Sequence, residues 1–314
     1  MKAVKITLFT FLISAQIFAQ KIGNTNTTLE GFVQPIYKLQ LSNNKFTHNE
    51  FLINRFRLGA KSKINDRFDA VIEIDPLDQN LLVKDAKIGF NLNQNFTLYF
   101  GRQKIPFSRE RLISVKNIQY FERTKVVKEF NDLAFAGRDI GLLASFYTKI
   151  EKIKVNLTAG IFNGNKGDLD GDYNNSKTYA QRLEINYKNL SFGINSTQKF
   201  DSLTSKYFVA NGFDFEIDLI DNLSFSSEIL LGRKDSSTMT GGEYFSIEYK
   251  INDFVFGTRF SQYFSNIKKS PSNFFEAKID YRPLKEFRLS INWLTEKKSS
   301  KFENTLILGA SYVL

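Results

Sequence analysis

Hydrophobic and polar residues alternate at every second position along most of the chain, in segments of about ten residues separated by turn residues. Residues 213–219 show the pattern, because four apolar side chains fall on one face of an extended strand and three carboxylates fall on the other. About sixteen such segments can be traced along the chain. This periodicity is typical of a transmembrane antiparallel β-barrel, and we predict an all-β fold of about sixteen strands.

The connections between these segments alternate in length. Short turns at 64–67, 94–95, 188–189 and 252–253 alternate with longer polar stretches such as 163–177 and 234–242. Periplasmic turns on one rim and longer loops on the other produce this asymmetry, which favours a membrane barrel over a secreted sandwich with the same alternation. The alternation continues to Leu314, so we expect the last strand to pair with the first and leave no sheet edge.

The first nineteen residues have the features of a secretory signal peptide. Lys2 and Lys5 precede the apolar stretch 6–13, and Ala19 ends a plausible cleavage site. We therefore expect a signal peptide at 1–19, a barrel domain at 20–314 and a location in the outer membrane of a Gram-negative bacterium. The chain has no cysteine, which excludes disulfides and thiolate metal sites in the exported protein.

One connection, from Lys104 to Arg138, is far too long to be a turn, and loops of this length are uncommon unless they are functional. On residues in and around it, the chain resembles the phosphate-selective porin O and P family. The residues that carry the resemblance are Gly101, Gln103, Ile105, Pro106, Phe107, Ser108, Glu110, Leu112, Ser114, Phe121, Glu122, Arg123, Arg138, Asp139 and Gly141, together with Phe162, Asn163 and Gly164.

The resemblance implies a sixteen-stranded porin, usually trimeric, whose third long loop (104–138) folds into the lumen as a constriction. We therefore expect a homotrimeric outer-membrane porin, surrounded by outer-membrane lipids, for passive diffusion of small hydrophilic solutes. Phosphate selectivity belongs to some members of the family, and we expect a preference for anions such as phosphate. A non-conducting structural or adhesion barrel is the alternative.

The expected constriction loop carries eight basic and four acidic side chains, a local excess of four positive charges. A cationic ring in a narrow pore concentrates anions, and arginine donors match phosphate oxygens. The competing interpretation is that half of these side chains form ion pairs that anchor the loop. The candidate anion-selecting residues are Lys104, Arg109, Arg111, Arg123, Lys125, Lys128 and Arg138.

Basic residues also follow one face of the strand before the turn at 64–67, where we expect them on the lumen wall: Arg55, Arg57, Lys61 and Lys63. Folding this hairpin about Asn65 predicts the pairs Arg55 with Asp75, Arg57 with Glu73, and Lys61 with Asp69. Opposite charges across a strand pair stabilise each other by roughly 0.2–1 kcal/mol. We therefore favour pairing over anion transport for this ladder.

The lumen wall is also expected to hold Asp214, Glu216 and Asp218, which no basic residue of their own hairpin compensates. Either a basic residue from another part of the wall pairs with them, or the pore has an acidic wall and only modest selectivity.

The remaining charges indicate no other chemistry. The formal net charge of +10 becomes +8 without Lys2 and Lys5, but export makes nucleic acid an unlikely partner. Three aspartates at 168, 170 and 172 are spaced as in a calcium loop, yet Tyr179 occupies the closing position, so we expect a solvated loop and no metal or cofactor. The single histidine, His48, has no motif around it, and we predict no enzymatic activity.

Overall fold

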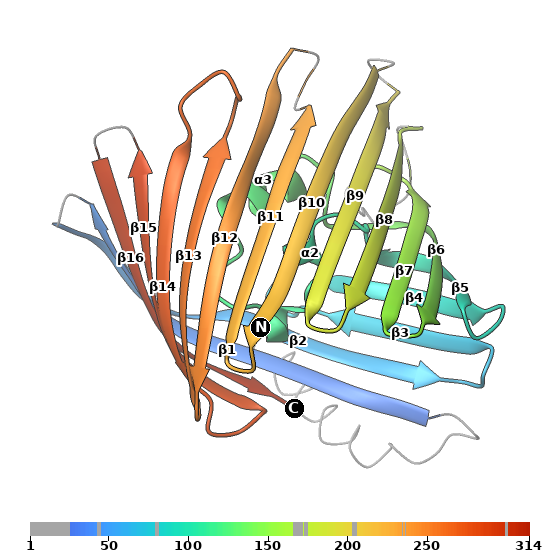
Figure 1. The fold of residues 1–314 in the computed structure, drawn as a ribbon, viewed down its shortest axis with the longest axis horizontal. Helices are drawn as coiled ribbons and strands as arrows, with labels where there is room; N and C mark the ends of the chain where they lie inside the picture. Colours follow the sequence, from blue (N-terminus) through green and yellow to red (C-terminus); the bar gives the residue numbers. More distant parts are fainter. Residues whose placement is uncertain are drawn as a thin grey trace, which may run out of the picture.

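The computed structural model describes residues 26–42, 45–78, 82–165, 172, 175–202, 206–233, 235, 237–298 and 301–314; the expected signal peptide lies outside them. The described residues form sixteen strands that close into one antiparallel barrel (Figure 1). The predicted fold class and strand number are therefore confirmed. Among the described residues, no helix has both the length and the apolar character needed to span a membrane.

Each strand pairs with its neighbours in the sequence, so the barrel is a simple meander. The first eight strands are β1 (Asn26–Ser42), β2 (Lys45–Lys63), β3 (Phe68–Ile74), β4 (Val83–Asn91), β5 (Phe96–Lys104), β6 (Arg138–Ile150), β7 (Ile153–Phe162) and β8 (Lys177–Tyr187). The others are β9 (Leu190–Asp201), β10 (Lys206–Ile220), β11 (Leu223–Arg233), β12 (Met239–Ile251), β13 (Phe254–Phe264), β14 (Ser272–Tyr281), β15 (Phe287–Lys298) and β16 (Lys301–Val313).

The barrel closes between its first and last strands, as the alternation near the C-terminus predicts. β1 and β16 pair antiparallel from Phe32 opposite Val313 to Ser42 opposite Glu303. Beyond the last strand, the Leu314 N–H donates to the Gly31 carbonyl at 2.8 Å. No edge strand remains, so every strand has a partner on both sides over at least part of its length.

The two faces of the wall differ as the alternation predicts. On β10, the Phe213 side chain is 42% exposed on the outer surface, while the neighbouring Asp214 is fully buried on the lumen side. The same outward apolar face continues through Phe245, Phe260 and Phe275 on β12, β13 and β14. An apolar outer face and a polar inner face are what a barrel in a bilayer requires.

The hairpin of β2 and β3 does not have the predicted register. Lys63 lies opposite Asp69 and Gly59 opposite Glu73, which is two residues away from the pairing predicted by folding about Asn65. The physical reason is the turn. The Asn65 side chain accepts hydrogen bonds from the Arg67 and Phe68 N–H groups, at 2.8 and 2.9 Å, and this centres the hairpin on Asp66.

The connection between β5 and β6, residues 105–137, is called the inward segment. It contains the helix α2 (Arg109–Leu112), the short 3-10 helix η1 (Val115–Asn117) and the helix α3 (Lys125–Asp132). Its contacts reach wall strands that lie far apart around the barrel: Arg55 on β2 donates to the Phe121 carbonyl at 3.0 Å, and Glu228 on β11 accepts from Ser108 at 3.0 Å. The segment therefore crosses the lumen, and Figure 1 shows both helices within the ring of strands.

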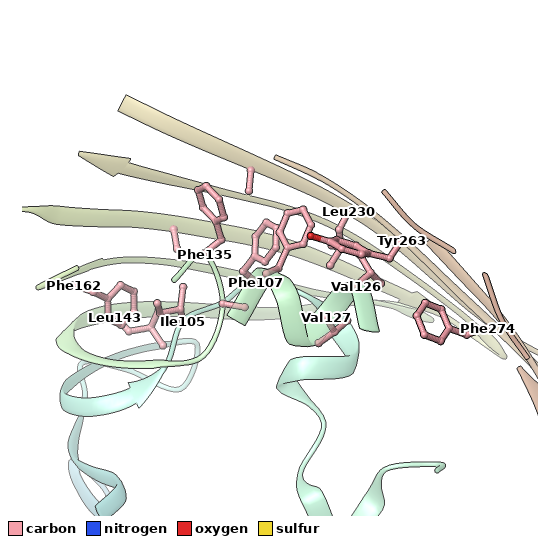
Figure 2. Packing of buried hydrophobic residues seen from close by; sticks show 14 residues of the cluster. Ile105, Phe107, Val126, Val127, Phe135, Leu143, Phe162, Leu230, Tyr263 and Phe274 are labelled. Carbon is pink, nitrogen blue, oxygen red and sulfur yellow. The ribbon is translucent and has the colours of Figure 1, made fainter. Parts of the chain in front are cut away.

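An apolar cluster holds α3 against the wall. Val126, Val127 and Phe130 are spaced so that they share one face of the helix, and all three are buried. They belong to a cluster that also contains Leu230 on β11 and Tyr263 on β13 (Figure 2). Burying a large apolar side chain contributes roughly 1.5–3 kcal/mol, so this cluster favours the inward position of the segment.

Candidate functional site

Two cavities lie inside the barrel beside the inward segment. The first, of about 600 Å³, is called the outer chamber because it reaches the connection between β3 and β4, on the rim with the longer connections. Eight basic side chains and three carboxylates line it, an excess of five positive charges. The basic residues are Arg55, Arg57, Lys84, Arg102, Arg111, Arg123, Lys128 and Arg138, and the acidic residues are Asp78, Glu122 and Asp132.

The second cavity, of about 610 Å³, is called the inner chamber because it lies toward the rim with the short turns. Its charged lining is nearly balanced, with six basic residues (Lys61, Lys87, Lys104, Lys116, Arg138 and Arg182) and four acidic residues (Glu30, Glu73, Asp85 and Glu184). Val115 and Arg138 line both chambers. The two chambers therefore meet at these residues, and the stronger positive charge lies on the outer side.

Four of the seven candidate anion-selecting residues are paired with carboxylates. Arg109 contacts Glu216, and Lys125 lies 2.5 Å from Glu129 within α3. Lys128 lies 2.8 Å from Glu122.

Arg138 has two carboxylate partners: it contacts Glu73 and Asp85 on the wall, each at 2.9 Å. The anchoring interpretation matches the geometry for Arg109 and Arg138, whose partners lie on wall strands, whereas Lys125 and Lys128 pair with carboxylates of the inward segment itself.

The other three candidates have no carboxylate partner among the described residues. Lys104 donates to the Leu112 and Ile113 carbonyls at 2.7 and 3.2 Å, and Arg123 donates to the Glu110 and Ile113 carbonyls at 3.0 and 2.9 Å. The Nε of Arg111 is buried and has no hydrogen-bond partner in the described part of the chain. A backbone carbonyl carries no net negative charge, so it orients a cation without neutralising it as a carboxylate does.

Arg55 joins these residues, against the prediction that it pairs with Asp75. The shifted register brings Asp75 to Arg57 instead, while Arg55 donates, within the described part of the chain, to the Phe121 carbonyl alone. The Nη1 of Arg55 is buried without a hydrogen-bond partner among the described residues. We call Arg55, Arg111 and Arg123, which all line the outer chamber, the arginine cluster.

The rest of the basic ladder is paired. Arg57 lies 3.7 Å from Glu73, so this predicted neighbour is confirmed, and Arg57 also contacts Asp75. Lys61 pairs with Glu30 on β1 at 2.7 Å, not with Asp69 as predicted. Lys63 pairs with Asp66 in the turn at 3.0 Å.

The positive potential of the arginine cluster is reflected in the ionisation of its members on the inward segment. Burial, followed by the charges of Arg123 and Arg138, lowers the pKa of Arg111 to about 9. Burial and the charge of Arg55 lower the pKa of Arg123 to about 10. Both residues remain charged at neutral pH, and each raises the free energy of the other in the absence of an anion.

The acidic residues of β10 do not form an exposed acidic wall. Asp214 accepts two hydrogen bonds from Arg182 on β8, at 2.5 and 2.8 Å, and Glu216 contacts Arg109 of the inward segment. Asp218 lies exposed near the short turn. Of the two interpretations, compensation from another part of the wall is correct for Asp214, and Glu216 is compensated from the inward segment instead. Arg182 was not a sequence candidate, and its only signal was its place on the polar face of β8.

Two wall residues that the sequence did not indicate anchor the inward segment. The buried Glu228 on β11 accepts hydrogen bonds from the Ser108 hydroxyl at 3.0 Å and from the Arg109 N–H at 2.7 Å. The buried Arg259 on β13 donates to Glu110 at 2.6 Å and to Glu276 at 2.6 Å. These contacts attach the N-terminal end of α2 to β11 and β13 of the wall, whereas the arginine cluster lies around the outer chamber together with Arg55 of β2.

Several residues that carry the family resemblance have structural roles. Gly101 adopts φ +126°, and a Cβ there would lie 2.2 Å from the Ala86 carbonyl oxygen, so only glycine fits. The buried Asp139 accepts a hydrogen bond from the Gly164 N–H at 2.7 Å, which ties the end of β7 to the start of β6. These residues hold the base of the inward segment and do not contact the arginine cluster.

The potential of the outer chamber leads to a first prediction, for which the cysteine-free chain provides a clean background. In a Val115→Cys variant, we expect a negatively charged methanethiosulfonate to react about tenfold faster than a positively charged one. This ratio corresponds to a positive potential that favours the anionic reagent over the cationic one near Val115 by about 1.4 kcal/mol. The ratio of the two labelling rates is the measurement. Thr47→Cys, at the exposed tip of β2, is the control and should show a ratio near one. Equal rates at Val115 would contradict a positive chamber.

His48 and Asp172 are not among the residues that line the two chambers. Asp168 and Asp170 lie outside the described residues, and no group of metal-ligating side chains is present among those described. His48 is exposed on β2 and lies 3.5 Å from Glu50.

Comparisons with known proteins agree with the barrel. A family model described as phosphate-selective porin O and P matches residues 33–209. An anion-selective porin from Comamonas acidovorans is 11% identical with a TM-score of 0.68, and the match covers 93% of this chain and 100% of that one. The outer-membrane channel DcaP of Acinetobacter baumannii is 14% identical with a TM-score of 0.64, covering 95% and 99%.

A trimer form of OmpT, an outer membrane protein of Vibrio cholerae, is 10% identical with a TM-score of 0.59, covering 92% of this chain and 99% of that one. No curated protein sequence matches the chain. At these identities the solved structures show a shared fold, and the family model supplies the relationship in sequence.

Proposed function

The chain belongs to the phosphate-selective porin O and P family, and from this premise we propose that it is an outer-membrane porin whose arginine cluster makes it favour anions. The location in the outer membrane and the role as a porin follow from the family, and the family and the fold favour a channel over an enzyme. The preference for anions is the finer proposal. The observation that supports it is the arginine cluster, three guanidinium groups without a carboxylate partner among the described residues of the outer chamber.

The positions of the charges explain why the preference should be for anions. Glu216 and Glu228 are occupied in holding the inward segment against the β10–β11 wall, and Asp214 pairs with Arg182 of β8 and lies 3.9 Å from Arg109. The three cations of the arginine cluster, which have no carboxylate partner among the described residues, face the outer chamber. A fixed charge counts most where the pore is narrow and water screens it least, so the chamber enriches anions and repels cations.

The direct test is the reversal potential of single channels in a planar bilayer under a potassium chloride gradient. We expect a reversal potential closer to the equilibrium potential of chloride than to that of potassium, because chloride should be the more permeant ion. A channel that prefers potassium would leave only a general diffusion pore. A protein that inserts but passes no current would support the alternative of a non-conducting structural or adhesion barrel.

We also propose that the porin is a homotrimer. The support is the resemblance to porins in general and the existence of a trimer form of OmpT with the same fold.

A further inference from the structure

The outer chamber combines features that a site for a single small inorganic ion does not need. Its volume of about 600 Å³ lies within the roughly 300–1,000 Å³ typical of sites for organic ligands. Its lining is not uniformly charged, because Val115, Val127 and Ala136 of the inward segment form an apolar part. An organic molecule with a carbon skeleton would use both parts of this lining.

The arginine cluster indicates how many anionic groups such a molecule should carry. Its three guanidinium groups come from β2, from α2 and from the stretch before α3, so they approach the chamber from different elements. Each guanidinium can hold one phosphate or carboxylate group with two hydrogen bonds. The buried Nη1 of Arg55 and Nε of Arg111 have no partner in the described part of the chain, and an unsatisfied buried donor is costly.

We propose that the outer chamber is a binding site for small organic anions that carry two phosphate or carboxylate groups on one carbon skeleton. This inference rests on the proposed anion preference and extends it from inorganic anions to a class of organic solute. Two anionic groups would satisfy two arginines at once, and the carbon skeleton would lie against the apolar part of the lining. Linking two anionic groups makes the second contact intramolecular, which raises affinity above that of either group alone.

The test is block of the chloride current through single channels by three probes: fructose 1,6-bisphosphate, glucose 6-phosphate and inorganic phosphate. We expect fructose 1,6-bisphosphate to half-block the current at a concentration at least tenfold lower than inorganic phosphate does. Glucose 6-phosphate should lie between them. Glucose, which has no charge, should not block at the same concentrations, and this separates binding from simple obstruction.

Variants assign the block to the chamber. Arg111→Ala should weaken block by the bisphosphate at least tenfold while the channel still conducts chloride. Lys269→Ala removes a basic residue from the exposed connection between β13 and β14 and should leave the block unchanged.

Two results would overturn the inference without touching the proposed function. One is a chloride-selective channel in which inorganic phosphate blocks as well as the bisphosphate does. The other is block by the bisphosphate that Arg111→Ala does not weaken. A channel that prefers potassium would instead contradict the proposed function itself.

Discussion

Replacing Arg111 by glutamate is expected to abolish the preference for chloride over potassium. Arg111 lines the outer chamber, has no carboxylate partner among the described residues, and its Nε makes no hydrogen bond there, so its charge is available to a solute. A unit charge about 6 Å from a passing ion contributes about 1.4–2.8 kcal/mol at an effective dielectric constant of about 40 to 20. Reversing the charge at position 111 should therefore lower the ratio of chloride to potassium permeability by tenfold or more. The measurement is the shift of the reversal potential in a salt gradient.

Lys125→Glu is the matched control, because it changes the charge of the same segment by the same amount. Lys125 is exposed, pairs with Glu129 and is not part of the lining of either chamber as described. Reversing the charge of Lys125 should shift the reversal potential much less than reversing the charge of Arg111. Equal shifts from the two variants would mean that the total charge of the segment, and not its position, sets the preference. That result would contradict the proposal that the arginine cluster selects anions.

Replacing Arg259 by alanine is expected to destabilise the barrel by about 3–5 kcal/mol, the cost of breaking a buried ion pair. Arg259 is 2% exposed and compensates two carboxylates, Glu110 on the inward segment and Glu276 on β14. It also lies over the Tyr120 ring at 4.2 Å. Without it, both carboxylates stay buried with too little positive charge, and the inward segment loses a main attachment. The midpoint of urea unfolding in detergent micelles is the measurement.

Lys63→Ala is the control for this variant. It removes an exposed pair with Asp66, and such surface pairs contribute about 0–1 kcal/mol. Limited proteolysis gives a second measurement, since the segment 105–137 should be cut faster in Arg259→Ala than in the wild type. The prediction would be contradicted if the free energy of unfolding of Arg259→Ala lay within about 1 kcal/mol of the wild-type value. Other contacts, such as those of Glu228, would then suffice to hold the segment.

The location of the inward segment could be predicted from the sequence, but its charge distribution could not. The length of 104–138 and the family resemblance identified the segment and seven candidate cations. Arg109 and Arg111 are two residues apart on α2 and look equivalent in the sequence. In the structure, Arg109 contacts Glu216, more than a hundred residues away, while Arg111 has no such partner among the described residues.

The register of the β2–β3 hairpin shows how a small local difference changes the site. The alternation predicted that Arg55, Arg57, Lys61 and Lys63 share one face of β2. Centring the turn on Asp66 instead of Asn65 moved Asp75 from Arg55 to Arg57. A shift by two residues keeps every side chain on its face but changes every partner, so Arg55 entered the arginine cluster.

The sequence by itself determined the barrel, its closure and the face on which most strand residues lie; Leu52, beside an irregularity in β2, lies inward against Phe121 and not on the outer face with Phe56. The reason is that a period of two is a property of neighbouring residues, and it appears in the chain before any long-range contact forms. Which cations are neutralised was decided only by the tertiary structure, because ion pairs such as Arg182 with Asp214 join strands that are not consecutive. Charge can be counted along a chain, but its effect on a solute depends on where the folded wall places the opposite charges.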